Sequence, residues 1–170
     1  MKTKRPAIAL VLSLAAFAPA AAIWVPQTRP EFVQAVADGK GATAMETIHS
    51  DQPLRRVYDL LHKKVTACLD VKTQRTAYVG YVERSSTDYN PTLRLVGKDR
   101  AEFTLQVEHN PRGVGAKPPA GGLYYMAANL RSVNGGTEIV LYRPTIGVKK
   151  IVASLKQWFA GDPAPCPKLR

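Results

Sequence analysis

The chain has few of the residues from which catalytic and metal sites are usually built. Its 170 residues include only two cysteines and three histidines. The histidines, His49, His62 and His109, stand in different predicted elements, whereas a metal site needs clustered ligands. The sequence also lacks the spacings of phosphate-binding glycine loops, of a nucleophile elbow and of a histidine-containing triad. We therefore expect no catalytic residue, no metal and no cofactor, and predict that the protein is not an enzyme.

Carboxylates that could form an acid–base pair are present, but their pattern favours solvent-facing positions. The candidates are Glu83, Asp88, Glu102 and Glu108. Glu102 and Glu108 follow the polar alternation of a predicted strand, which places them on its solvent-facing side. A hydrolase is the least favoured of our three hypotheses, and a buried carboxylate or histidine pair in a cleft would support it.

No apolar run after residue 22 approaches the length of a transmembrane helix, which needs about 17–25 residues. Residues 1–22 have a basic start, an uncharged run at 7–18, then Pro19 and the small residues Ala20 and Ala22. This order is typical of a cleaved secretory signal peptide, with cleavage after Ala20 or Ala22. A retained membrane anchor is the alternative, although the apolar run is too short to span a bilayer. The predicted location is therefore periplasmic or secreted.

Acidic residues are also scarce, at 13 against 24 lysines and arginines, which gives a formal charge of +11. The basic surplus is scattered over predicted helices, strands and turns rather than clustered. Because the protein is predicted to be exported, we do not expect nucleic acid as a partner. Most of the surplus is expected to be solvated surface. A weak attraction to anionic lipid or another envelope polyanion is the alternative.

Two amphipathic helices are predicted, one before and one after a series of predicted strands. The first begins at Ser50 or Asp51 and ends at Cys68, and its apolar positions share one face. The second begins near Thr145, a good cap, and ends at Gly161, where a left-handed residue is expected. Its broad apolar stripe must pack on an apolar surface; the stripe contains Val148, Ile151, Val152, Leu155, Trp158 and Phe159. A shorter helix is predicted at 31–38.

Between these helices the pattern changes to a period of two, which predicts antiparallel strands joined by turns. A strand at 76–83 is expected to contain a bulge at Gly80, and 85–91 is expected to be turn. The remaining predicted strands are 93–95, 101–108, 123–133 and 137–143, with a long loop at 110–122 and an Asn134-Gly135 hairpin turn. We predict an α+β fold, a two-layer sandwich in which an antiparallel sheet of about five strands packs against an N-terminal and a long C-terminal helix. Residues 50–170 would form this single domain, and 23–49 an N-terminal extension.

The two cysteines lie next to predicted helix ends. Cys68 ends the first main helix and Cys166 follows the last one. In an exported chain, two cysteines predict one intramolecular disulfide. A reactive cysteine or an intermolecular bond is the alternative. A nucleophilic Cys68 would need a base close by, and His62, six positions earlier on the helix, points elsewhere.

Three short stretches resemble a group of uncharacterised proteobacterial exported proteins and lipoproteins. They are 68–71 (CLDV), 121–130 (GGLYYMAANL), and 158–161 followed by Cys166-Pro167. The resemblance implies an envelope location and a Cys68–Cys166 pair, and it brings no known activity. Many members of the group look lipid-anchored, whereas this chain has no cysteine after its predicted signal. The order of elements also resembles the helix-grip arrangement of START-like lipid-binding domains, by analogy of fold alone.

Two functions compete besides the hydrolase. The first is a non-catalytic interaction or structural module of the cell envelope, whose partner is an envelope protein or an anionic surface. The alternative is a carrier that encloses a small apolar, lipid-like ligand between the C-terminal helix and the sheet, with the 110–122 loop as a lid. The carrier predicts a cavity of a few hundred Å³ there. Its candidate lining residues are Tyr78, Phe103, Tyr125 and Trp158.

Overall fold

The computed structural model describes residues 25–78, 80, 82–112 and 117–169. Residues 1–22, for which a signal peptide is predicted, lie outside this part of the chain. The described elements follow one another as α1 (Arg29–Ala37), β1 (Thr43–Ser50), α2 (Leu54–Cys68), β2 (Val71–Tyr78), β3 (Val82–Leu95), β4 (Arg100–Asn110), β5 (Leu123–Val133), β6 (Gly136–Pro144) and α3 (Lys149–Phe159).

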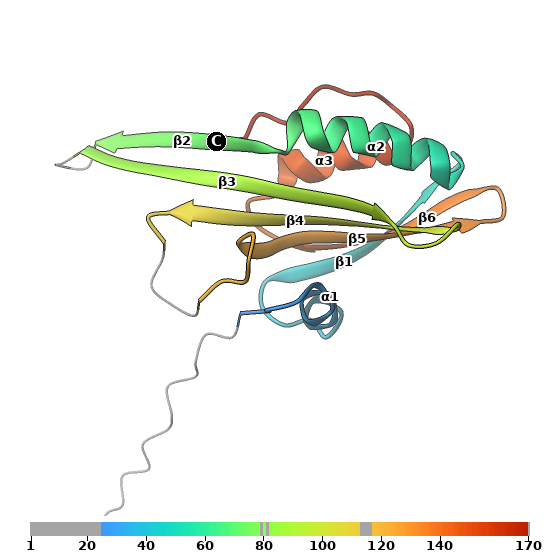
Figure 1. The fold of residues 1–170 in the computed structure, drawn as a ribbon, viewed down its shortest axis with the longest axis horizontal. Coiled ribbons are helices and arrows are strands. Elements are labelled where there is room, and N and C mark those ends of the chain that lie inside the picture. Colours follow the sequence, from blue (N-terminus) through green and yellow to red (C-terminus); the bar gives the residue numbers. More distant parts are fainter. Residues whose placement is uncertain (1–24, 79, 81, 113–116, 170) are drawn as a thin grey trace, which may run out of the picture.

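The strands form one antiparallel sheet in the order β1-β6-β5-β4-β3-β2. Helices α2 and α3 lie together on one face of this sheet, and α1 lies on the other (Figure 1). Strands β5 and β6 are joined by the two-residue turn Asn134-Gly135, because Val133 pairs directly with Gly136. The predicted α+β class, antiparallel sheet and Asn-Gly hairpin are therefore confirmed, with six strands in place of about five.

The main core lies between the sheet and the pair α2 and α3. The predicted apolar stripe of α3 is buried along its whole length, and Trp158 and Phe159 have no exposed surface. The indole of Trp158 donates a hydrogen bond of 3.0 Å to the carbonyl of Ala164, which satisfies the one polar atom that this burial would otherwise strand. The sheet supplies Phe103, Leu105, Met126, Leu130, Ile139 and Leu141.

Helix α1 packs on the opposite face, which the two-layer prediction did not include. Phe32 and Val36 form a second cluster with Ala127 and Tyr142 of the sheet. Arg29, at the start of the helix, donates to Thr104 Oγ1, to the Ala128 carbonyl and to Asn129 Oδ1. Helix α1 therefore covers part of this face of the sheet, although the polar residues that alternate along the strands predict a solvent-facing surface.

Residues of the predicted N-terminal extension take part in this sheet. Strand β1 pairs along its full length with β6, from Thr43 opposite Pro144 to Ser50 opposite Thr137. Its sequence, TAMETIHS, shows no clean apolar alternation, because an edge strand buries little of either face. The sequence pattern therefore missed it.

The predicted strand at 76–83 is instead the end of a hairpin. Strand β2 ends at Tyr78, which pairs with Val82 at the start of β3. Gly80 lies between them with a φ of +76°, a left-handed conformation that turns the chain back. The predicted turn at 85–91 lies inside β3, where Pro91 pairs with Leu105. Serine, threonine and asparagine are frequent in this stretch, and in the sequence they read as a turn.

The helix ends follow the sequence signals only in part. Gly161 has a φ of +86° after α3, as predicted. Thr145 does not cap α3; its backbone N–H and its hydroxyl both donate to the Ala42 carbonyl. Ser50 and Asp51 do not cap α2 either, because Ser50 still belongs to β1 and the cap position is Pro53.

The predicted disulfide between Cys68 and Cys166 is present. It joins the end of α2 to the segment after α3 across a sequence separation of 98 residues. Lys64 of α2 supports the same connection by donating to the carbonyls of Pro163 and Ala164. The C-terminal segment is thus fastened to α2.

The disulfide is expected to account for a large share of the stability. Closing a loop of this length lowers the entropy of the unfolded chain and so raises its free energy by about 4–5 kcal/mol in the entropy model. The double variant C68A/C166A is therefore expected to lose up to about 4 kcal/mol in the free energy of unfolding, measured by denaturant titration. Reduced wild-type protein is the control and should lose a similar amount. A loss of well under about 1 kcal/mol in both samples would contradict the expectation.

A second stability prediction concerns Glu46 on β1. Its carboxylate accepts from Lys156 of α3 and lies 3.5 Å from Arg143 Nη2. The hydrogen bond from Lys156 holds the pKa of Glu46 below its ordinary value of 4.5. Because the folded pKa is lowered, this pair stabilises the fold above pH 4.5, and the contribution is lost as the pH falls through the lowered value.

We therefore expect E46Q to lower the melting temperature at neutral pH and to differ less from wild type in acid. The exposed Asp51, which has no ion pair with the described residues, provides the matched control D51N. A melting-temperature difference for E46Q that is constant from neutral pH to well below pH 4.5 would contradict the ion-pair explanation.

Candidate interaction surface on the β2–β3 arm

The hairpin of β2 and β3 carries a group of exposed polar and apolar side chains that the core does not explain. We call the β2 residues Val71–Tyr78 and the β3 residues 82–89 that pair with them the arm. Strand β4 ends at Asn110, opposite Ser86, so 82–85 pair only with β2 in the described structure. The free end of the arm projects beyond the helices and beyond β4 (Figure 1). Its side chains therefore contact little besides each other.

A cleft of about 540 Å³ lies along the arm. Three of its lining residues are cations, Lys72, Arg75 and Arg84, and none is a carboxylate. Arg75 and Arg84 are exposed, and neither forms a hydrogen bond or ion pair with the described residues. The cleft is therefore a basic surface; its other lining residues are Gln74, Thr76, Ser85, Ser86 and Asn110.

The end of the arm is apolar. Tyr78 is 81% exposed and Val82 is 53% exposed. The two residues are cross-strand partners, so their side chains stand next to each other on one face. Thr76 and Arg84 are the next pair on that face, because side chains alternate along a strand. An exposed aromatic and aliphatic pair is thus followed directly by a cation.

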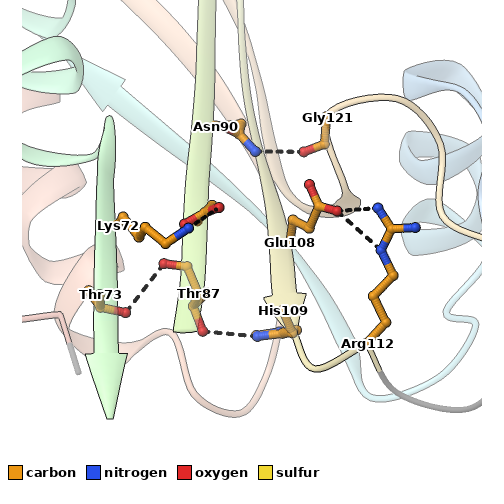
Figure 2. A network of polar contacts seen from close by, with 9 residues as sticks. Lys72, Thr73, Thr87, Asn90, Glu108, His109, Arg112 and Gly121 are labelled. Atoms are coloured by element: carbon orange, nitrogen blue, oxygen red, sulfur yellow. Dashed lines mark hydrogen bonds and ion pairs between the residues drawn. The ribbon is translucent and has the colours of Figure 1, made fainter. Parts of the chain in front are cut away.

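A network of polar contacts surrounds the base of the arm, where β3 pairs with β4 (Figure 2). Lys72 Nζ lies 3.1 Å from Asp88 Oδ2, across the β2–β3 ladder. Asn90 donates to the carbonyl of Gly121 in the loop before β5 at 2.9 Å. Glu108 accepts from Arg112 on the other side. The arm is therefore held at one end and free at the other.

The same network contains the one hydroxyl–imidazole contact among the described residues. Thr87 Oγ1 lies 3.0 Å from His109 Nδ1, and the Thr87 carbonyl accepts from the hydroxyl of Thr73. No carboxylate is hydrogen-bonded to this imidazole in the described part of the chain. The neighbouring Glu108 points to the other face of the sheet by strand alternation. Together the two contacts link the neighbouring strands β2, β3 and β4, so their role is structural.

Metal binding finds no support in the described ranges, where no group of three or more His, Cys, Asp or Glu side chains is placed to hold an ion.

Two tyrosines near the inner end of the arm have a structural role. Tyr89 and Tyr125 are half-buried against the main core. Burial raises the pKa of both phenols, and Tyr89 adds to the shift of Tyr125.

The four residues proposed from the sequence as ligand contacts do not come together. Phe103 and Trp158 are fully buried in the main core. Tyr125 packs at the edge of that core, whereas Tyr78 is exposed at the end of the arm. Of these four, only Tyr78 belongs to the surface described above.

The sequence analysis missed Arg75, Val82 and Arg84 because it placed one continuous strand across the hairpin turn. In that reading, Gly80 is a bulge within the strand, and Tyr78 is a candidate lining residue of a ligand cavity. The signal that could have separated the two strands is the glycine in the middle of YVGYV, residues 78–82. A left-handed glycine between two β-prone pairs is typical of a hairpin turn.

No protein-family model, curated protein or solved structure matches this chain. The resemblances suggested by the short motifs therefore stay predictions. The function of the arm is accordingly argued from its own geometry and charge.

Proposed function

We propose that this protein is a non-catalytic interaction module of the cell envelope that binds an anionic surface through the basic residues of the arm. The observation that carries the proposal is the cleft of about 540 Å³ that Lys72, Arg75 and Arg84 line without any carboxylate. Two of these cations have no partner within the described structure. They are therefore free to bind an anion from outside.

The compartment agrees with this role. An intramolecular disulfide is typical of an oxidising environment such as the periplasm or the cell exterior. Export through the predicted signal peptide at 1–22 would deliver the chain there. Within the described residues, no helix is long and apolar enough to cross a membrane.

The packing favours this module over the carrier. A carrier needs open space between α3 and the sheet, and Phe103 and Trp158, which were expected to line it, have no exposed surface. A cleft of about 540 Å³ lies on the arm instead. Space for a ligand and free positive charge thus occur together outside the core.

The attraction should be modest and sensitive to salt. A lysine or arginine close to an anionic surface contributes about 1 kcal/mol, and the effect fades within a Debye length of about 8–10 Å. Lys72 is partly neutralised by Asp88. Arg75 and Arg84 should therefore dominate.

The test is retention on a polyanionic matrix such as phosphocellulose, eluted with a salt gradient. The variant R75E/R84E is expected to elute at clearly lower salt than wild type, because it reverses both free cations of the arm. The matched control is R56E/K63E, which makes the same change in net charge on the exposed side of α2. It should elute closer to wild type.

Equal shifts for the two double variants would overturn the proposal, because retention would then follow net charge alone. Circular dichroism and thermal melting should be unchanged in both, since all four side chains are exposed and none has a hydrogen bond or ion pair to the described residues.

A further inference from the structure

The free end of the arm carries an exposed apolar pair, and two arginines follow it along the strands. Large apolar residues are substantially exposed at five described positions: Met45, Tyr78, Val82, Leu95 and Ile146. Tyr78 and Val82 are direct cross-strand partners and the last described pair before the hairpin turn. The other three belong to β1, to the end of β3 and to the loop before α3. Two of the five thus stand side by side on the part of the arm that does not pair with β4.

The arginines follow at a defined depth. A strand rises about 3.3 Å per residue, so Arg84 stands about 7 Å behind Val82 and Arg75 about 10 Å behind Tyr78. By strand alternation the two arginines fall on opposite faces of the arm. Glu83, which pairs with Ala77, is the one carboxylate near the tip. A cation therefore flanks the apolar pair on each face.

The depth of Arg84 matches the polar layer of a lipid bilayer. The bilayer adds roughly 5–8 Å of headgroup region on each side of its hydrocarbon core, given about 40–45 Å in total and about 30 Å of hydrocarbon. A tyrosine ring prefers the boundary between the two regions. With Tyr78 and Val82 at that boundary, Arg84 would lie among the phosphates, and the long side chain of Arg75 would reach back to them from just outside the layer.

Other anionic partners fit less well. A soluble polyanion is fully hydrated and would leave the apolar pair exposed. A stable protein–protein interface buries about 800 Å² per partner, far more than two side chains at a hairpin end provide. Arginines behind an apolar tip are complementary to lipid phosphates above an acyl boundary.

We propose that the end of the arm inserts into a bilayer containing anionic phospholipid, with Tyr78 and Val82 entering the acyl boundary and Arg75 and Arg84 binding headgroup phosphates. This inference rests on the proposed function, because it takes the arm as the contact surface. It adds the identity of the surface and a part for the apolar tip.

The experiment is co-sedimentation of the protein with vesicles of phosphatidylglycerol and phosphatidylcholine in equal amounts, compared with phosphatidylcholine alone. Wild-type protein should bind the anionic vesicles more tightly. The variant Y78S/V82S should bind them about tenfold more weakly, although its net charge is unchanged. The matched control M45S/I146S removes two exposed apolar side chains elsewhere and should bind like wild type.

A second measurement reports insertion directly. In Y78W, the fluorescence added to that of the native tryptophans should shift to shorter wavelength on anionic vesicles and be quenched by brominated acyl chains. It should do neither with heparin, a soluble polyanion.

The outcomes separate this inference from the proposed function. Vesicle binding that is equal for wild type and Y78S/V82S, no binding at all, or an unshifted Y78W spectrum would overturn insertion. The proposed function would still stand if R75E/R84E lost retention on phosphocellulose. Unchanged retention of R75E/R84E would instead overturn the proposed function, whatever the tip variants do.

Discussion

Burial of the apolar sides of α2 and α3 on one face of the sheet is the constraint on which the rest of the structure depends. Trp158 and Phe159 have no exposed surface, and full burial of each large apolar side chain is worth about 1.5–3 kcal/mol. Each helix carries its apolar side chains on one side only, so it can bury them only by packing that side against an apolar surface. The sheet must therefore present a matching apolar face from β3 to β6. The disulfide then ties the segment after α3 to the end of α2, so that the two helices stay together on that face.

The cations of the molecule fall into two groups, those of the packed body and those of the arm. On the packed body, cations near the sheet are engaged: Arg29 with Glu102, Thr104 and the end of β5, and Lys156 with Glu46. Burial lowers the pKa of Arg29, and contact with Glu102 opposes this shift, so the ion pair keeps a half-buried guanidinium charged. On the arm, the side chains of Arg75 and Arg84 form no hydrogen bond or ion pair within the described structure. The cations of the packed body are thus paired within the fold, whereas the two arginines of the arm are available to a partner.

The sequence predicts those parts of the fold that bury one face completely. The apolar stripes of α2 and α3, the strand at Ala101–Glu108, the Asn134-Gly135 turn and the Cys68–Cys166 bond all have strong local signals, and all are present. Strand β1 and the true course of β2 and β3 were missed, because edge strands and a projecting hairpin bury too little to impose an alternation. The candidate surface lies in this weakly patterned region. The glycine of YVGYV is its one local signal, and the register then places Tyr78 opposite Val82 and beyond the end of β4.

Protection of exposed sheet edges offers a simpler reason for charges on the arm. Arginine or lysine on a free edge discourages pairing with another chain, and both edges are free at 82–85 and their partners. That explanation covers Arg75 and Arg84, but it does not cover Tyr78 and Val82. A two-stranded ribbon is only marginally stable in water, and an exposed apolar pair at its end adds no core. If edge protection were the whole purpose, polar residues would serve better at the tip. The apolar pair therefore decides between the two explanations, and it favours a surface that the arm enters over an edge that is merely shielded.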